Sequence, residues 1–174
     1  MKINILKILI FSIVSFLLVV FFIGLSKNSN YNTKNLVGNK ISNFELISIF
    51  EDEKKINQEN LKIKEYSLIN FFASWCLPCR IEHKYLLNLS KENKQIKIIG
   101  INFKDNKVNA TNFLNELGNP YDLVASDTEG KASILFGIYG IPESLLIDKN
   151  LTIIKKIIGP INENQYKELI KLIK

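Results

Sequence analysis

The N-terminal part of the chain is dominated by one uninterrupted hydrophobic segment. Residues 8–25 (ILIFSIVSFLLVVFFIGL) contain no charged side chain, and Lys2 and Lys7 precede them. An apolar helix of this length can cross the ~30 Å hydrocarbon core of a bilayer. Basic residues before such a helix favour an N-terminus that stays in the cytoplasm. The pattern therefore predicts a cytoplasmic tail at residues 1–7 and an uncleaved transmembrane anchor at residues 8–25.

A cleaved signal peptide is the alternative interpretation of this segment. Gly24 and Ser26 are small residues at a possible cleavage site. The apolar run, however, is longer than the roughly 7–15 residues usual for such peptides, and no clear Ala-x-Ala site follows it. Under both interpretations, the residues after this segment lie outside the cytoplasm. The Asn-rich, aperiodic residues 26–36 then predict a polar tether.

From residue 37 to residue 174 the hydrophobic pattern predicts one globular domain. Uninterrupted apolar runs predict buried strands, and apolar positions at helical spacing predict helices. The expected strands are residues 66–72, 96–102, 121–126, 143–148 and 151–158, and the expected helices are residues 76–93, 109–117, 130–136 and 163–174. The first strand, helix and strand predict a parallel pair, and the last two strands predict an antiparallel hairpin. The fold class is therefore α/β, with a mixed central sheet flanked by helices.

The composition limits the classes of function without selecting one. Of 174 residues, 47% are hydrophobic and 23% are charged, which is ordinary for one globular domain. The net charge is +6, but the lysines are scattered among Asn, Ile and acidic residues. They form no basic stripe with interleaved aromatic residues, so we do not expect nucleic-acid binding.

The only two cysteines, Cys76 and Cys79, lie in the segment INFFASWCLPCRIEH. Such a Cys-x-x-Cys pair can supply two ligands to zinc, pack in the core, or form a catalytic dithiol. A structural zinc site needs four ligands, and besides the two cysteines His83 is the only usual soft or borderline ligand in the chain. Two packed cysteines would not require the neighbouring Trp75 and Pro78. The catalytic dithiol is therefore preferred, and no metal is expected.

The position of the pair, between a predicted buried strand and the next helix, predicts different roles for the two sulfurs. Cys76 would lie at the helix N-terminus, where free N–H groups and the helix dipole stabilise a thiolate. We therefore expect it to be the exposed nucleophile, with a lowered pKa. Cys79, one turn into the helix and more deeply buried, would resolve the mixed disulfide. Pro78 restrains the turn without removing a needed helix donor.

The segment WCLPC after a buried strand resembles the active site of the thioredoxin superfamily, and GIYGIPESLLID (residues 137–148) resembles its second signature. The resemblance implies a thioredoxin-like fold in which a cis-proline, Pro142, faces the dithiol. The residues implied to bind substrate are Trp75, Pro78, Ile141, Pro142 and Glu143. No cofactor is implied besides the redox-active disulfide between Cys76 and Cys79.

Four segments narrow this resemblance to one family. Together, WCLPCRIEH, GINFKDN, ELGNPYDL and GIYGIPESLLID look like the membrane-anchored thiol:disulfide interchange proteins of cytochrome c maturation, the CcmG/DsbE family. Thioredoxins proper carry a buried Asp in the strand before the motif, where this chain has Asn70. The family also carries an inserted segment between the second and third core strands, and residues 102–127 fit that segment.

Two acidic residues close to the expected dithiol indicate whether the protein is a reductant or an oxidant. Glu82 follows Cys79 by three residues, and Glu143 follows the expected cis-proline. Negative charge near Cys76 opposes its thiolate, so both acids favour a reductant over an oxidant. We expect Glu82 to be partly solvated and to tune the thiol pKa and the proton supply. His83 is expected to lie on the helix surface.

A reductant in an oxidising compartment needs electrons from across the membrane. The resemblance implies a membrane electron donor of the CcdA or DsbD type, and a single-pass protein of the bacterial inner membrane with its domain in the periplasm. The implied client is the Cys-x-x-Cys-His haem-attachment site of apocytochrome c, or a partner protein of cytochrome c maturation. Two alternatives remain open, a general exported reductant of the TlpA or ResA type and a non-catalytic thioredoxin-like adaptor.

Overall fold

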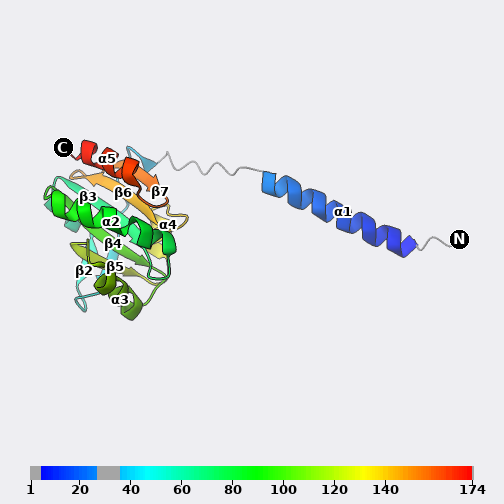
Figure 1. Ribbon diagram of the computed structural model, residues 1–174, viewed down its shortest axis with the longest axis horizontal. Helices are drawn as coiled ribbons and strands as arrows, with labels where there is room; N and C mark the ends of the chain where they lie inside the picture. The colour runs from blue at the N-terminus through cyan, green and yellow to red at the C-terminus, as the bar shows by residue number, and fades with distance from the viewer. Residues whose placement is uncertain (1–4, 27–35, 174) are drawn as a thin grey trace. The chain divides into compact units, whose positions relative to one another are not determined.

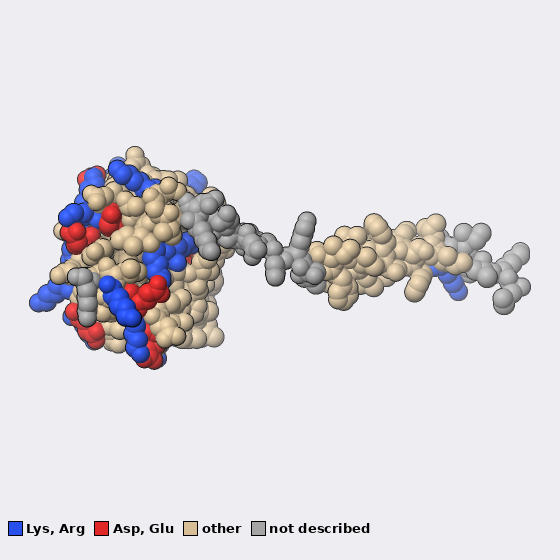
Figure 2. All heavy atoms as spheres, turned by 90° about the horizontal axis from the view of Figure 1, so that it is seen from above, with Lys and Arg blue, Asp and Glu red and all other residues tan. Residues whose placement is uncertain are grey.

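The computed structural model describes residues 5–26 and 36–173, which belong to two separate units, an N-terminal helix and a C-terminal domain (Figure 1). Helix α1 (Ile5–Ser26) contains the predicted hydrophobic segment. It is the one helix in the described part of the chain that is long and apolar enough to cross a membrane. Figure 2 shows its surface without charge apart from basic atoms at one end. Most of the predicted tether, residues 27–35, lies outside the described residues.

The C-terminal domain is built on one seven-stranded mixed sheet. Its strands are β1 (Glu45–Ser48), β2 (Lys55–Asn57), β3 (Tyr66–Phe72), β4 (Ile96–Phe103), β5 (Leu123–Asp127), β6 (Glu143–Asp148) and β7 (Ile153–Ile158). They lie in the order β2-β1-β5-β4-β3-β6-β7. β3 pairs parallel with β4 and antiparallel with β6, and β6 pairs antiparallel with β7. The predicted parallel pair and the predicted hairpin are both confirmed.

The helices are α2 (Leu77–Glu92), α3 (Lys107–Leu117), α4 (Lys131–Leu135) and α5 (Glu163–Leu172), with a 3-10 helix, η2 (Gln58–Ile63). Two hydrophobic clusters occupy the two faces of the sheet. Residues of α2, α3 and α5 belong to one cluster, while residues of η2 and α4 belong to the other. Figure 1 shows α2 lying across the face formed by β3 and β4. The predicted α/β fold with helices on both faces is therefore confirmed.

The side chains of strand β3 alternate between the two faces of the sheet. Successive side chains of a strand point to opposite faces. Leu68 and Phe72 belong to the cluster under α2, and Ile69 and Phe71 belong to the cluster on the opposite face. Asn70 has the same parity as Leu68 and Phe72, so this buried polar side chain points toward α2. The alternation of β3 therefore places an amide directly under the helix that carries the cysteines.

The edge formed by β1 and β2 was not predicted. These strands have only four and three residues, too few to show a clear period, and a charged turn separates them. β1 pairs with β5, which itself lies in the inserted segment together with α3, between the core strands β4 and β6. The insertion therefore widens the sheet on the side away from β7.

The charged side chains of the domain are mixed on its surface. Figure 2 shows Lys and Arg interspersed with Asp and Glu on the visible face, with no broad area of one sign. Many of these charges are paired, as in Lys54 with Glu51, Lys107 with Asp52, and Arg80 with Glu116.

Candidate active site

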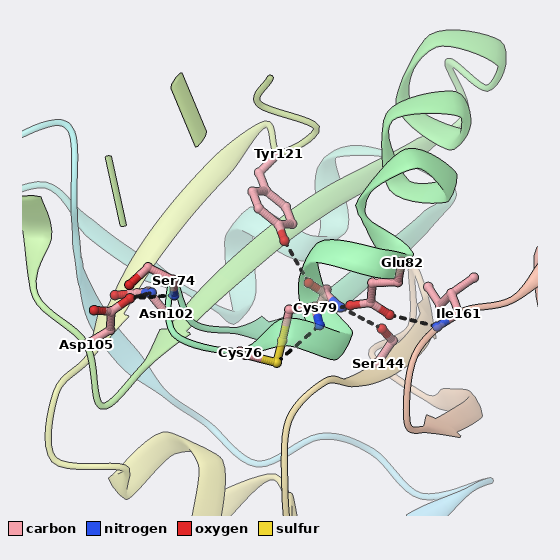
Figure 3. Close-up of a disulfide and its surroundings, with 10 residues drawn as sticks. Ser74, Cys76, Cys79, Glu82, Asn102, Asp105, Tyr121, Ser144 and Ile161 are labelled. Atoms are coloured by element: carbon pink, nitrogen blue, oxygen red, sulfur yellow. Dashed lines mark hydrogen bonds between the residues drawn. A yellow bond between two sulfur atoms is a disulfide. The ribbon is translucent and has the colours of Figure 1, made fainter. Parts of the chain in front are cut away.

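The two cysteines form a disulfide where β3 leads into α2 (Figure 3). Cys76 is the N-cap of α2 and has an extended backbone, and Pro78 lies within the first two helical positions. The backbone N–H of Cys79 lies 3.2 Å from Sγ of Cys76 and donates to it. A sulfur at an N-cap accepts a donor that the helix leaves free, which favours negative charge on that sulfur. The geometry therefore distinguishes Cys76 from Cys79.

The expectation that Cys76 is exposed is wrong for this oxidised form. Cys76 is 4% exposed and Cys79 is 2% exposed, so burial hardly separates the two. Both belong to the hydrophobic cluster under α2, because the disulfide turns their sulfurs toward each other and into the protein. The neighbouring residues Trp75, Leu77 and Pro78 are exposed.

The loop before Cys76 is held by the segment that follows β4. The indole N–H of Trp75 donates to the carbonyl oxygen of Lys104 at 3.2 Å, and the backbone N–H of Ser74 donates to Oδ2 of Asp105 at 2.7 Å. Asn102 Nδ2 donates to the same oxygen at 3.0 Å. Burial would raise the pKa of Asp105, but the hydrogen bonds from Ser74 and Asn102 hold it below its ordinary value. The segment GINFKDN contributed to the family resemblance, but the sequence alone indicated no role for Asp105.

Glu82 lies fully buried one helical turn beyond Cys79 (Figure 3). The expectation that it is partly solvated is wrong, because this side of α2 packs onto the sheet. Oε1 accepts a hydrogen bond from Asn70 Nδ2 at 2.8 Å, and Oε2 accepts one from the backbone N–H of Ile161 at 2.8 Å. Burial raises the pKa of Glu82 from 4.5 to about 7, although both hydrogen bonds favour the carboxylate. The acid can therefore gain and lose a proton near neutral pH.

The partner of Glu82, Asn70, is itself fixed by further hydrogen bonds. Tyr121 donates its hydroxyl to Asn70 Oδ1 at 2.7 Å, and Asn70 Nδ2 also donates to Ser144 Oγ at 3.0 Å. Gly100 leaves room for this arrangement, since a Cβ there would lie 2.9 Å from the ring of Tyr121. Sequence reasoning missed Tyr121 and Ser144. A polar residue in the middle of an apolar strand was the available signal that a buried partner must exist.

His83 does not lie on the surface as expected. It is buried, and its Nε2 lies 2.8 Å from the carbonyl oxygen of Gly118, so that nitrogen is the donor. Its ring packs edge-on against the ring of Phe113, with 5.2 Å between centroids. Burial lowers the pKa of His83 below its ordinary value. The inserted segment, which carries Phe113 and Gly118, covers this face of α2, and the helix pattern alone could not show that.

The second part of the site is the loop before β6. The peptide bond between Ile141 and Pro142 is cis. Ile141 packs against the same hydrophobic cluster that contains both cysteines. A shallow groove of about 310 Å³ is lined by residues 139–143 together with Ile158 and Gly159. The cis-proline segment therefore offers an open surface beside the cluster that holds the disulfide.

The negative charge of Glu143 is balanced by a lysine for which the sequence indicated no role. The ammonium of Lys156 in β7 lies 2.8 Å from Oε2 of Glu143, and the side chains of both are only 3% exposed. Oε1 of Glu143 accepts hydrogen bonds from the backbone N–H groups of Tyr139 and Gly140. The negative charge of Glu143 is thus balanced locally, which leaves Glu82 as the uncompensated acid beside the dithiol.

This arrangement can perform disulfide exchange. The thiolate of one cysteine can attack an external disulfide, and the second cysteine lies within bonding distance to release the product. Glu82 can exchange a proton near neutral pH as the charge on sulfur changes. In the described part of the chain, no group of three or more His, Cys, Asp or Glu side chains is placed to hold a metal ion.

Comparison with known proteins agrees with this chemistry. The Redoxin family model matches residues 36–170. The thiol:disulfide interchange protein DsbE of Vibrio cholerae is 39% identical over 169 residues, covering 93% of this chain and 90% of that protein. The thiol:disulfide interchange protein CycY of Rhizobium leguminosarum is 50% identical over 102 residues, covering 59% of this chain and 54% of that protein.

Solved structures share the fold. The thioredoxin domain of a thiol-disulfide oxidoreductase from Bacteroides vulgatus has a TM-score of 0.68 at 20% identity, covering 79% of this chain and 98% of that one. A secreted disulfide oxidoreductase of Mycobacterium tuberculosis, homologous to Escherichia coli DsbE, has a TM-score of 0.63 at 14% identity, with coverages of 75% and 93%. Given its match to the Redoxin model, its similarity to DsbE along nearly its whole length, and its Cys-x-x-Cys disulfide, this chain belongs to the DsbE/CcmG-type thiol:disulfide oxidoreductases of the thioredoxin superfamily.

Proposed function

We propose that this protein is a membrane-anchored reductant of cytochrome c maturation. Its task would be to keep the Cys-x-x-Cys-His haem-attachment cysteines of apocytochrome c, or of a partner protein, in the dithiol form. The main observation that supports a reductant is the buried Glu82. It lies one turn from Cys79 and has no cationic partner among its hydrogen bonds. The family supports the client class.

In the proposed cycle, the Cys76 thiolate of the reduced protein attacks a sulfur of the client disulfide. The client's other sulfur leaves as a thiolate and takes up a proton, and a mixed disulfide forms. Cys79 then attacks Sγ of Cys76, releases the second client thiol and closes the Cys76–Cys79 disulfide. Two electrons and two protons pass from the protein dithiol to the client. A membrane electron donor of the CcdA or DsbD type would restore the dithiol.

Glu82 favours this direction for an electrostatic reason. A carboxylate buried near Cys76 raises the free energy of the Cys76 thiolate, and a destabilised thiolate makes the dithiol give up its electrons more readily. Glu143 adds little to this effect, since its charge is paired with Lys156. As its pKa is about 7, Glu82 can also take the proton that a cysteine releases and return it to solvent.

The proposed location is the bacterial inner membrane, with α1 as an uncleaved anchor and the domain in the periplasm. Protein isolated from membranes of the producing cell should retain the whole hydrophobic segment, because that segment is long and its basic flank is N-terminal. Intact-mass measurement checks this, and protease added to spheroplasts checks the orientation. A mature protein that begins near Lys27 would show that the segment is a cleaved signal.

Trapping the client tests the proposed function directly. The Cys79→Ser variant should accumulate a mixed disulfide between Cys76 and its natural client, because the resolving sulfur is gone. Adducts would be separated on non-reducing gels and identified by mass spectrometry, with Cys76→Ser/Cys79→Ser as the matched control. The expected adduct contains apocytochrome c or a maturation partner. Many unrelated clients would favour the general TlpA or ResA type of reductant, and adducts equal to the control would favour a non-catalytic adaptor.

A further inference from the structure

A buried ion pair joins the start of β6 to the edge strand β7. Glu143 and Lys156 lie diagonally across this antiparallel pair, since Leu145 is the direct partner of Lys156. The ammonium lies 2.8 Å from Oε2 of Glu143, and each side chain is 3% exposed. A buried charge is expensive unless it is paired and hydrogen-bonded. Each of the two residues therefore depends on the other.

Both members of the pair also bind the loop before the cis-proline. Glu143 Oε1 accepts hydrogen bonds from the backbone N–H of Tyr139 at 3.1 Å and of Gly140 at 3.2 Å. Lys156 Nζ donates to the carbonyl oxygen of Gly137 at 2.5 Å. It also lies 5.2 Å from the centre of the Tyr139 ring, within range of a cation–π contact. Three backbone groups and one ring of a single loop are thus held by two opposite charges.

The loop held in this way is one wall of the groove beside the hydrophobic cluster that contains the disulfide. Residues 139–143 line that groove together with Ile158 and Gly159, the residues that end and follow β7. Ile141 of this wall packs against the cluster that contains Cys76. An extended polypeptide covers more surface around the reacting sulfur than a small disulfide does, so its exchange rate depends more on the shape of this wall. The hydrogen bonds and the ion pair of Glu143 and Lys156 go to each other and to this loop, so any effect of the pair on exchange passes through the shape of the loop.

We propose that Lys156 is a positioning residue for exchange with polypeptide disulfides. Its ammonium compensates Glu143 and anchors Gly137, and so fixes residues 137–142 in the conformation that receives an extended chain. Without it, the Glu143 carboxylate is buried with no counter-charge and the loop loses its bond at Gly137. The inference rests on the exchange activity and not on the identity of the natural client.

Lys155 provides a matched control. It is the preceding residue of the same strand, its side chain is 21% exposed, and it pairs with Glu168 of α5. Successive side chains of a strand point to opposite faces, so Lys155 points away from the groove wall. Replacing either lysine with methionine removes one ammonium from β7 and keeps an unbranched apolar stem.

The test compares two substrates on the reduced full-length protein in detergent. One is a small aromatic disulfide, and the other is a synthetic peptide with an internal Cys-x-x-Cys disulfide. Lys156→Met should slow exchange with the peptide about tenfold and exchange with the small disulfide less than about twofold, since a displaced positioning group costs rate only where it positions substrate. Lys155→Met should leave both rates near wild type. Amide hydrogen exchange should show lost protection at Tyr139 and Gly140 in Lys156→Met only.

The double variant Glu143→Gln/Lys156→Met separates charge compensation from packing. It leaves no buried charge unpaired, so its peptide rate should lie between those of Lys156→Met and wild type. If the single variant fails to fold, the double variant is measured in its place. A double variant with the wild-type peptide rate and wild-type amide protection would then overturn the proposal. Equal slowing of both substrates in Lys156→Met, or no slowing of either, would also overturn it.

Discussion

Replacing Cys76 with serine should abolish disulfide exchange. The rate constant with a small disulfide should fall by more than about a thousandfold, the scale expected when a nucleophile is lost. Cys76 is expected to react first because it is the N-cap of α2 and its sulfur accepts the backbone N–H of Cys79 at 3.2 Å. Single-turnover kinetics of the reduced protein would measure this loss, and Cys79→Ser should keep the first half-reaction at a rate similar to wild type.

The order of the two sulfurs can be checked without mutation. Alkylation of the reduced protein at mildly acidic pH should label Cys76 before Cys79, since only a thiolate reacts at a useful rate. Peptide mapping by mass spectrometry gives the order, and the urea-unfolded protein, in which the two thiols should react alike, is the control. Labelling of Cys79 first, or full activity of Cys76→Ser, would assign the nucleophile to the other cysteine.

Replacing Glu82 with glutamine should remove a pH-dependent loss of stability. In the folded protein the pKa of Glu82 is about 7, raised by burial from 4.5. Between these values the folded state binds more protons than the unfolded state, so the free energy of unfolding falls as pH rises from about 4.5 to about 7. The full loss approaches ~3 kcal/mol, at about 1.4 kcal/mol per pKa unit. Glu82→Gln should therefore be the more stable protein at pH 8, with a smaller difference at pH 4.5.

Urea unfolding of the oxidised full chain in detergent, followed by circular dichroism, would measure this difference. Glu92→Gln is the matched control, because it makes the same chemical change on the exposed side of α2. Ten residues along a helix put it about 15 Å from Glu82, beyond the roughly 8–10 Å over which exposed charges act in ordinary salt. If Glu82→Gln and wild type lose stability alike as pH rises, Glu82 does not hold a buried proton.

The same substitution should make the redox couple more oxidising. With the carboxylate gone, the Cys76 thiolate is stabilised, so its pKa should fall and the potential should rise by about 20 to 30 mV. The shift should grow above pH 7, where Glu82 is ionised in the wild type. The potential can be followed through fluorescence of Trp75, the sole tryptophan, in redox buffers from pH 6 to 8. An unchanged potential and an unchanged Cys76 pKa would remove Glu82 from the redox mechanism.

The sequence by itself determined the features that depend on neighbours along the chain. β3 has the predicted bounds, and α2 begins directly after Cys76, because an apolar strand, an N-cap and a helical repeat are local patterns. The disulfide partner was determined as well, since only two cysteines exist. The resemblance carried by the segments around Cys76 and Pro142 led to the correct family, because those residues take part in the chemistry itself.

Only the tertiary structure decided the state of the acids and of His83. Spacing along α2 placed Glu82 near the dithiol, but its buried hydrogen bonds come from Asn70 of β3 and from Ile161, which lie in other parts of the chain. The inserted segment buries His83, and β7 supplies Lys156 to Glu143. Charge and pKa in a protein depend on solvent exclusion and on partners across the sheet, and local periodicity contains neither.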